Sequence, residues 1–244
     1  HRARMARARF DQLDAVLDDL GVDELAGFLF DLGDSSPQLD RDDRGFSFRN
    51  EGPLGMRMDP DGPPSAADVV NDSNERDLAA LLQRNGDERC ARRIAAAIVA
   101  ARPILTTTEL AEIVVAAIPA AARRTGGHPA KRTFQAIRIE VNEELTTLAP
   151  ALDAAIERLA PGGRGLVLTY HSGEDRIVKQ TFRARTEVIA PPGLPVDPDP
   201  ADFELLRPVA RTPSDAEISA NRRASSARLR GIRRRDTARA EVTA

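Results

Sequence analysis

Side chains able to bind a ligand follow the apolar run Phe28-Leu29-Phe30. They are Asp31, Ser35, Ser36 and Gln38, with Gly33 allowing the backbone to turn between them. An unbroken apolar run predicts a strand buried on both faces, as in a parallel sheet. Ligands of open α/β sheets bind beyond the carboxyl ends of the strands. This stretch is therefore either a ligand site or a polar turn that binds nothing, and these residues alone do not favour one over the other.

A second polar cluster, His171 to Asp175, follows the predicted strand 165–170. It contains a histidine, a serine and an aspartate, but residues adjacent in sequence rarely face one another as a hydrolytic triad requires. We therefore disfavour a hydrolase. The chain's three histidines and single cysteine lack the spacing of metal ligands, so we expect no metal site.

The loop over residues 41–60 mixes arginines with aromatic residues. A loop this long inside a compact domain is usually functional or disordered, and its apolar residues argue against disorder. Aromatic rings stack on bases and guanidinium groups neutralise phosphates, which makes RNA-binding candidates of Arg44, Phe46, Phe48, Arg49 and Arg57. The alternative is that apolar side chains anchor the loop to the core. We favour it for Met56 and Met58 and leave it open for the two phenylalanines.

A basic loop precedes the next predicted helix and contains Arg123, Arg124, Lys131 and Arg132 around Gly126-Gly127. Cations at a helix start suit phosphate binding, so these four residues are also RNA-binding candidates. A solvated basic loop is the alternative, because no strand precedes the glycines as in a phosphate-binding loop.

Composition sets limits on the class of protein. The chain has 244 residues, 41% of them hydrophobic, a net charge of -3 and the single cysteine Cys90. One cysteine cannot form an internal disulfide, and the basic start is not followed by an apolar segment as in a signal peptide. We expect a cytoplasmic protein without a membrane span.

Periodicity predicts an α/β fold with a helical insertion. Helices are expected over 10–20, 75–83, 88–101, 106–118, 134–148, 152–159 and 176–185, with a break at Pro150. Strands are expected at residues 28–31 and 165–170, with a further one around Leu229 and Ile232, and a turn at 161–164. Thr106 and Glu109 have the spacing of a capping box.

Several segments resemble the bacterial 16S ribosomal RNA cytosine-N4 methyltransferases. The motifs are Asp31-Leu32-Gly33, Ser35-Ser36-Pro37-Gln38-Leu39-Asp40, Arg44-Gly45-Phe46-Ser47-Phe48-Arg49, Met56-Arg57-Met58-Asp59, Gly126-Gly127-His128-Pro129-Ala130-Lys131-Arg132-Thr133-Phe134-Gln135-Ala136, His171-Ser172 and Glu174-Asp175-Arg176-Ile177-Val178-Lys179. The resemblance implies S-adenosyl-L-methionine-dependent methylation of a cytosine in the decoding region of 16S rRNA. It also implies a Rossmann-like class I methyltransferase core, with Phe10, Asp31 and Gln38 contacting the methyl donor.

The resemblance further implies how the chain is organised. We expect a partial methyltransferase core over 1–42, a helical insert for RNA recognition over 43–132, and the second half of the core with a basic tail over 133–244. The core is expected to be incomplete, because the family's glycine-rich loop and first strands precede the matching region. Candidate catalytic residues are Asp31, Ser35 and Ser36. The expected partner is 16S rRNA or the small ribosomal subunit, a homodimer stays open, and the alternative function is an inactive RNA-binding remnant.

Overall fold

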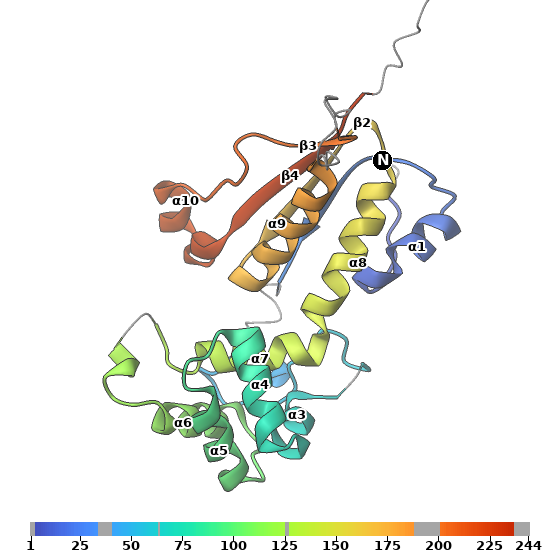
Figure 1. Ribbon diagram of the computed structural model, residues 1–244. Helices are drawn as coiled ribbons and strands as arrows, with labels where there is room; N and C mark the ends of the chain where they lie inside the picture. Colours follow the sequence, from blue (N-terminus) through green and yellow to red (C-terminus); the bar gives the residue numbers. More distant parts are fainter. Residues whose placement is uncertain (1–2, 34–40, 63, 125–126, 188–200, 237–244) are drawn as a thin grey trace, which may run out of the picture. The chain divides into compact units, whose positions relative to one another are not determined.

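The computed structural model describes residues 3–33, 41–62, 64–124, 127–187 and 201–236 (Figure 1). The chain divides into two compact units. The sheet unit is His1–Gly33 with Leu145–Ala244, and the helical unit is Asp34–Glu144. The helical unit is larger than the insert expected at 43–132, because the helix Lys131–Asn142 packs against the helix Glu75–Gly86 inside it.

The sheet unit is an α/β structure. Its elements are η1 (Phe10–Gln12), α1 (Leu13–Asp19), β1 (Leu25–Asp31), α8 (Glu144–Glu157), β2 (Leu159–Thr169), α9 (Ser172–Thr186), β3 (Phe203–Leu205), α10 (Asp215–Ala220), η4 (Arg222–Ser226) and β4 (Arg228–Arg234). In the described residues the sheet has the order β1-β2-β4-β3. β1 pairs with β2 in parallel, while β4 is antiparallel to both β2 and β3. The strand predicted near the C-terminal end is confirmed as β4.

One apolar core holds the sheet unit together. Strand residues meet residues of α8 and α9 there: Phe30, Leu32, Leu148, Ala151, Leu152, Ala155, Ile156, Leu159, Val167, Val178, Phe182 and Ile232. β1 contributes less than its sequence predicts. It lies at one end of the described sheet, Leu29 is 66% exposed, and Phe30 is the strand's one buried residue. The prediction of a strand buried on both faces is therefore wrong, although its parallel pairing is confirmed.

β2 begins earlier than predicted. Leu25 pairs with Leu159 and Gly27 with Arg164, so the stretch Pro161 to Gly163 forms an irregularity within the pairing rather than a turn before the strand. From Gly27 onward the register is regular, and Phe28 lies beside Gly165. A Cβ on Gly165 would lie 2.2 Å from the Phe28 ring, so the absence of a side chain is what allows the ring to cover β2.

The helical unit has its own core. Its elements are η2 (Asp42–Arg44), α3 (Ala66–Asp72), α4 (Glu75–Gly86), α5 (Ala91–Ala101), α6 (Thr107–Ala117), η3 (Ala122–Arg124) and α7 (Lys131–Asn142). The predicted capping box of α6 is confirmed, since Thr106 accepts from the Glu109 amide and the Glu109 carboxylate accepts from the Thr106 amide. The unpredicted α3 has a similar box formed by Ser65 and Asp68.

The helix break predicted at Pro150 lies elsewhere. Pro150 is inside α8, whereas α7 ends where Glu143 adopts a left-handed φ of 52°. The guanidinium of Arg138 reaches over this break and donates two hydrogen bonds of 2.8 Å to the Glu144 carboxylate. Such paired bonds are geometrically specific, and they stabilise the turn between the two helices.

Among the described residues, no helix combines the length and the apolar character that crossing a bilayer requires.

Candidate functional site

The carboxyl ends of β1 and β2 meet at one edge of the sheet. Asp31 is the last residue of β1 and pairs with Leu168, and the Leu32 amide donates to the Leu168 carbonyl at 3.0 Å. Tyr170 directly follows β2. Because parallel strands end at the same edge, Asp31 of the first predicted cluster and Tyr170, which directly precedes the second cluster, come together there.

Asp31 and Tyr170 are in direct contact. The Tyr170 hydroxyl donates a hydrogen bond of 3.0 Å to Asp31 Oδ1. Gly33, at a φ of 87°, lies beside the tyrosine ring, which would be 3.3 Å from an added Cβ. Burial, the hydrogen bond to Asp31 and the charges of Asp31 and Glu174 raise the pKa of Tyr170 to about 12. The phenol therefore stays protonated, and a donor, at neutral pH.

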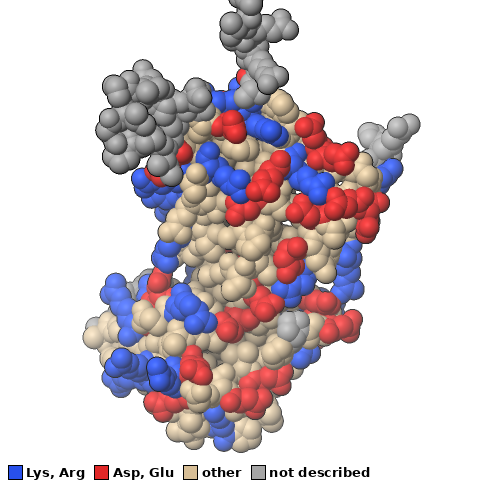
Figure 2. Space-filling model, turned by 45° about the vertical axis from the view of Figure 1, so that its right-hand side comes forward, with Lys and Arg blue, Asp and Glu red and all other residues tan. Residues whose placement is uncertain are grey.

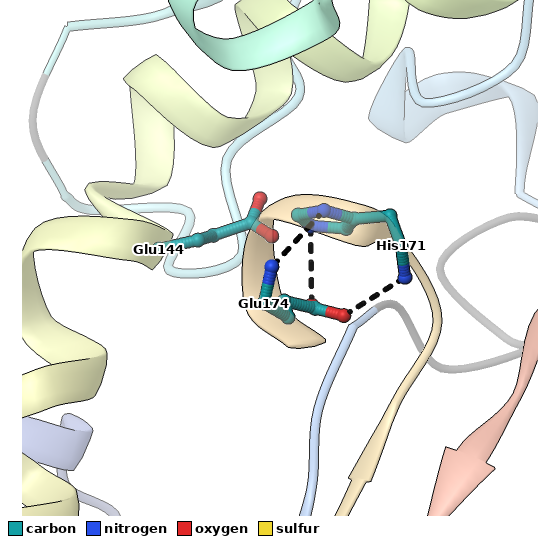
Figure 3. A group of neighbouring side chains, drawn as sticks. All are labelled: Glu144, His171 and Glu174. Atoms are coloured by element: carbon teal, nitrogen blue, oxygen red, sulfur yellow. Dashed lines mark hydrogen bonds and ion pairs between the residues drawn. The ribbon is translucent and has the colours of Figure 1, made fainter. Parts of the chain in front are cut away.

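The second cluster forms the start of α9 (Figure 3). His171 Nδ1 accepts from the amides of Gly173 and Glu174, at 3.2 and 3.4 Å. The Glu174 carboxylate accepts from the amides of Tyr170 and His171, at 2.7 and 3.2 Å. His171 Nε2 lies 3.3 Å from Glu174 Oε1 but is not aligned for a hydrogen bond. The cluster's histidine and glutamate thus cap a helix, which agrees with disfavouring a hydrolase.

Asp175 connects this helix start to β4. Its carboxylate accepts from Arg230 Nε at 2.7 Å and Nη2 at 3.0 Å, and Arg228 lies 3.5 Å away. Burial alone raises the pKa of Asp175, but the hydrogen bonds and charge of Arg230, with the charges of Arg228 and Lys179, outweigh it and hold the pKa below its ordinary value.

The other predicted donor-binding and catalytic residues divide into two groups. Phe10 stacks on Phe30, with ring centroids 5.7 Å apart and an interplanar angle of 11°, and stays 43% exposed. It therefore lies against the strand that carries Asp31. Ser35, Ser36 and Gln38 lie outside the described residues.

The aromatic RNA-binding candidates lie within the helical unit. Phe46 is 6% exposed and belongs to the core, with the Arg44 guanidinium 5.9 Å from its ring centroid. Phe48 is half-buried and stacks on His128 at 4.5 Å. Met56 is fully buried. Phe46 and Met56 thus anchor the long loop, so a base could not stack on Phe46 in this conformation.

Two of the basic candidates of this loop are engaged by the protein itself. Arg44 donates to the carbonyls of Arg57 and Met58, at 2.6 and 3.2 Å. Arg57 lies 3.5 Å from the Asp68 carboxylate. Of the three arginine candidates in this loop, Arg49 is the one that is exposed.

The basic loop before α7 is similarly divided. Arg123 donates to the Ile118 and Ala116 carbonyls at the end of α6, at 2.7 and 3.3 Å. Arg132 donates to the Asp87 carbonyl at 3.3 Å, and Lys131 is exposed. Arg124 is the last residue of η3, and its side chain is not among those that the structure describes. On the face drawn in Figure 2, basic and acidic side chains alternate rather than separate.

Tyr170 is not among the site residues predicted from the sequence. The available signal was its position, because it ends a predicted strand just as Asp31 ends the other one. Parallel pairing of these two strands was needed to bring the residues into contact, and the sequence alone does not specify which strands are neighbours.

Comparison with known proteins places the chain in a family. Residues 1–235 match the MraW methylase family. The chain is 51% identical to the ribosomal RNA small subunit methyltransferase H of Renibacterium salmoninarum over 238 residues, which cover 96% of this chain and 72% of that relative. The chain is 52% identical to the protein of the same name from Mycobacterium sp. (strain KMS) over 233 residues, which cover 95% of this chain and 63% of that relative.

A third relative, the ribosomal RNA small subunit methyltransferase H of Streptomyces avermitilis, is 50% identical over 238 residues, covering 96% of this chain and 75% of the relative. The chain thus spans between 63% and 75% of the length of these three proteins. The resemblance seen in the motifs is confirmed at the level of the family. The chain belongs to the MraW methylase family, a family of methyltransferases.

Proposed function

We propose that this protein methylates N4 of a cytosine in the decoding region of 16S rRNA, with S-adenosyl-L-methionine as the methyl donor. One observation carries the proposal beyond family membership. Asp31 presents an exposed carboxylate at the carboxyl end of a parallel strand pair, which is where open α/β sheets bind their ligands. A substrate of this kind also implies a cytoplasmic protein.

The residues at this edge suit the methyl donor. Asp31 can accept hydrogen bonds from the hydroxyl or amino groups of S-adenosyl-L-methionine. The exposed part of the Phe10 ring offers an apolar surface beside the same strand. Gln38, which is not among the described residues, is the third proposed contact.

The target amine is a weak nucleophile, because its lone pair is delocalised into the cytosine ring. The donor supplies a methyl group bound to a sulfonium sulfur, which is already electrophilic. Alignment of the two reactants is then the main contribution of the protein. As the carbon–nitrogen bond forms, the bond between the methyl group and the sulfur breaks and leaves a neutral thioether. The amine gives up one proton, for which Asp31 is the candidate acceptor, and the hydroxyls of Ser35 and Ser36 are candidates to accept hydrogen bonds from the amine. The base must be unstacked to reach such a site.

We assign RNA contacts to the helical unit. Arg49, Lys131 and Arg132 have exposed side chains suited to phosphate, and Arg123 and Arg124 lie in the same basic loop before α7. The half-buried Phe48 is the better aromatic candidate, since Phe46 is in the core. Arg44 and Arg57 are expected to act by shaping the loop that carries Arg49.

Asp31→Asn tests the proposal, because it keeps the size of the side chain and removes its charge. We expect weaker binding of S-adenosyl-L-methionine in calorimetry and less methyl incorporation into small ribosomal subunits. Asp23→Asn is the matched control, since Asp23 is an exposed aspartate just before the opposite end of β1. Donor binding and methylation that both survive Asp31→Asn would contradict the assigned site.

The same measurements separate the alternative function. An inactive RNA-binding remnant would bind RNA in a salt-sensitive manner without binding the methyl donor. Donor binding by the wild-type chain would exclude that alternative.

A further inference from the structure

We propose that Tyr170 is a positioning residue, which holds the Asp31 carboxylate in one orientation at the ligand edge of the sheet. This inference rests on the proposed function, in which Asp31 contacts the methyl donor or the target amine. The 3.0 Å hydrogen bond from the Tyr170 hydroxyl to Asp31 Oδ1 is its starting point.

Asp31 needs such a support. It is exposed and ends a strand at one end of the described sheet. Within the described part of the chain, Tyr170 is the only hydrogen-bond partner that the structure gives this carboxylate. A carboxylate without a partner rotates between conformers. Fixing it in one of them then costs conformational entropy, which lowers the affinity for the ligand.

Tyr170 is itself firmly held. It follows β2, which is paired on both sides, and its amide donates to the buried Glu174 carboxylate at 2.7 Å. On the Asp31 side, Gly33 leaves room for the aromatic ring. The hydroxyl is thus presented from a fixed backbone, which is what positioning a reactive group requires.

The chemistry of the phenol agrees with this role. Its pKa of about 12 keeps it neutral and protonated wherever binding would be measured. The phenol can therefore donate a hydrogen bond to Asp31 Oδ1 without adding a charge to the site. The second carboxylate oxygen, Oδ2, is then left to accept a hydrogen bond from a ligand. Tyr170 acts through Asp31 in this scheme and does not itself touch the reacting atoms.

The contact between Tyr170 and Asp31 can be tested by fluorescence, without an activity measurement, because Tyr170 is the only tyrosine and the chain has no tryptophan. All ultraviolet-excited emission beyond that of phenylalanine therefore comes from this side chain. A carboxylate hydrogen-bonded to a phenol quenches tyrosine emission, so we expect Asp31→Ala to increase it at neutral pH. Unchanged emission would overturn the proposal.

The functional consequence is tested with a double-mutant cycle on S-adenosyl-L-methionine affinity. Tyr170→Phe keeps the ring and removes the hydroxyl, and we expect donor binding about tenfold weaker. In the background of Asp31→Ala, the same substitution should have no further effect, since its target is gone. Equal effects in both backgrounds would mean that Tyr170 acts independently of Asp31.

Two comparisons complete the experiment. Thr169→Val removes the neighbouring hydroxyl, which donates to the Arg228 carbonyl, and it should leave donor affinity unchanged. If Asp31→Ala weakens binding and Tyr170→Phe does not, the positioning role is wrong while the proposed function stands. If the wild-type protein binds no donor, the proposed function fails. The emission of Asp31→Ala then still decides whether Tyr170 holds the carboxylate.

Discussion

Arg230 of β4 donates two hydrogen bonds to Asp175 in the first turn of α9, at 2.7 and 3.0 Å. Both residues are no more than 9% exposed. The pair therefore connects a central strand of the sheet to the helix whose start holds the Tyr170 backbone. Removing one partner of a buried ion pair leaves the other charge without compensation.

Arg230→Ala should lower the free energy of unfolding by about 3–5 kcal/mol, measured by urea denaturation. Arg183→Ala removes an exposed pair with Glu187 on the same helix and should cost no more than about 1 kcal/mol. A loss for Arg230→Ala as small as that of the control would mean that the pair does not stabilise the unit.

Acid should destabilise the protein partly through Asp175. Its pKa is lowered in the folded state, so the unfolded state binds more protons as the pH falls below the ordinary aspartate pKa of about 3.9. The stabilisation is complete above that value and is lost on going down through the folded pKa. As the pH is lowered from about 5 to about 2, unfolding midpoints should therefore fall less steeply for Asp175→Asn than for the wild type. Parallel curves would contradict the assignment.

Gly165→Ala should destabilise the sheet unit by about 1–3 kcal/mol, because the added Cβ would overlap the Phe28 ring. Combining it with Phe28→Leu, which removes the ring, should restore part of the loss. Thermal melts of the two single variants and the double variant measure this coupling. Strictly additive effects would mean that the two residues do not contact each other.

Thr106→Ala should cost about 1 kcal/mol through loss of the α6 cap. Thr106→Ser keeps the hydroxyl and should cost much less. Chemical denaturation compares the two, and an equal loss in both variants would point to the methyl group rather than to the cap.

Lys131→Ala should weaken binding of small-subunit RNA for all sequences alike and reduce the slope of log affinity against log salt by about 1. Arg44→Ala should instead lower stability and leave that slope unchanged, because its guanidinium binds backbone carbonyls. Filter binding at several salt concentrations provides the slopes. An unchanged slope for Lys131→Ala would exclude it from the RNA interface.

Local signals in the sequence predicted much of the fold. Helical spacing, the cap at Thr106 and the β4 residues Leu229 and Ile232 were sufficient to locate their elements. The exposure of Leu29 was not predictable, because an unbroken apolar run does not show whether its strand lies at the end of a sheet or in the middle. The left-handed conformation at Glu143 was missed because proline is the stronger helix breaker by propensity.

The candidate site was predictable to a similar extent. Asp31 was located at a strand end from the sequence, and the structure agrees. The contact with Tyr170 depends on long-range strand pairing, and the caps formed by His171 and Glu174 depend on where α9 begins. Both are tertiary facts that a local pattern does not contain.

The pairing of Phe28 with Gly165 also determines the order in which the protein assembles on the ribosome. β1 is synthesised before the helical unit, and the whole helical unit follows before β2 emerges. The helical core lies entirely between Phe46 and Val141, so it can condense through its own local contacts before β2 is available to pair with β1. Asp31 therefore meets Tyr170 only late in synthesis, and a nascent chain stopped within the helical unit contains no assembled ligand edge.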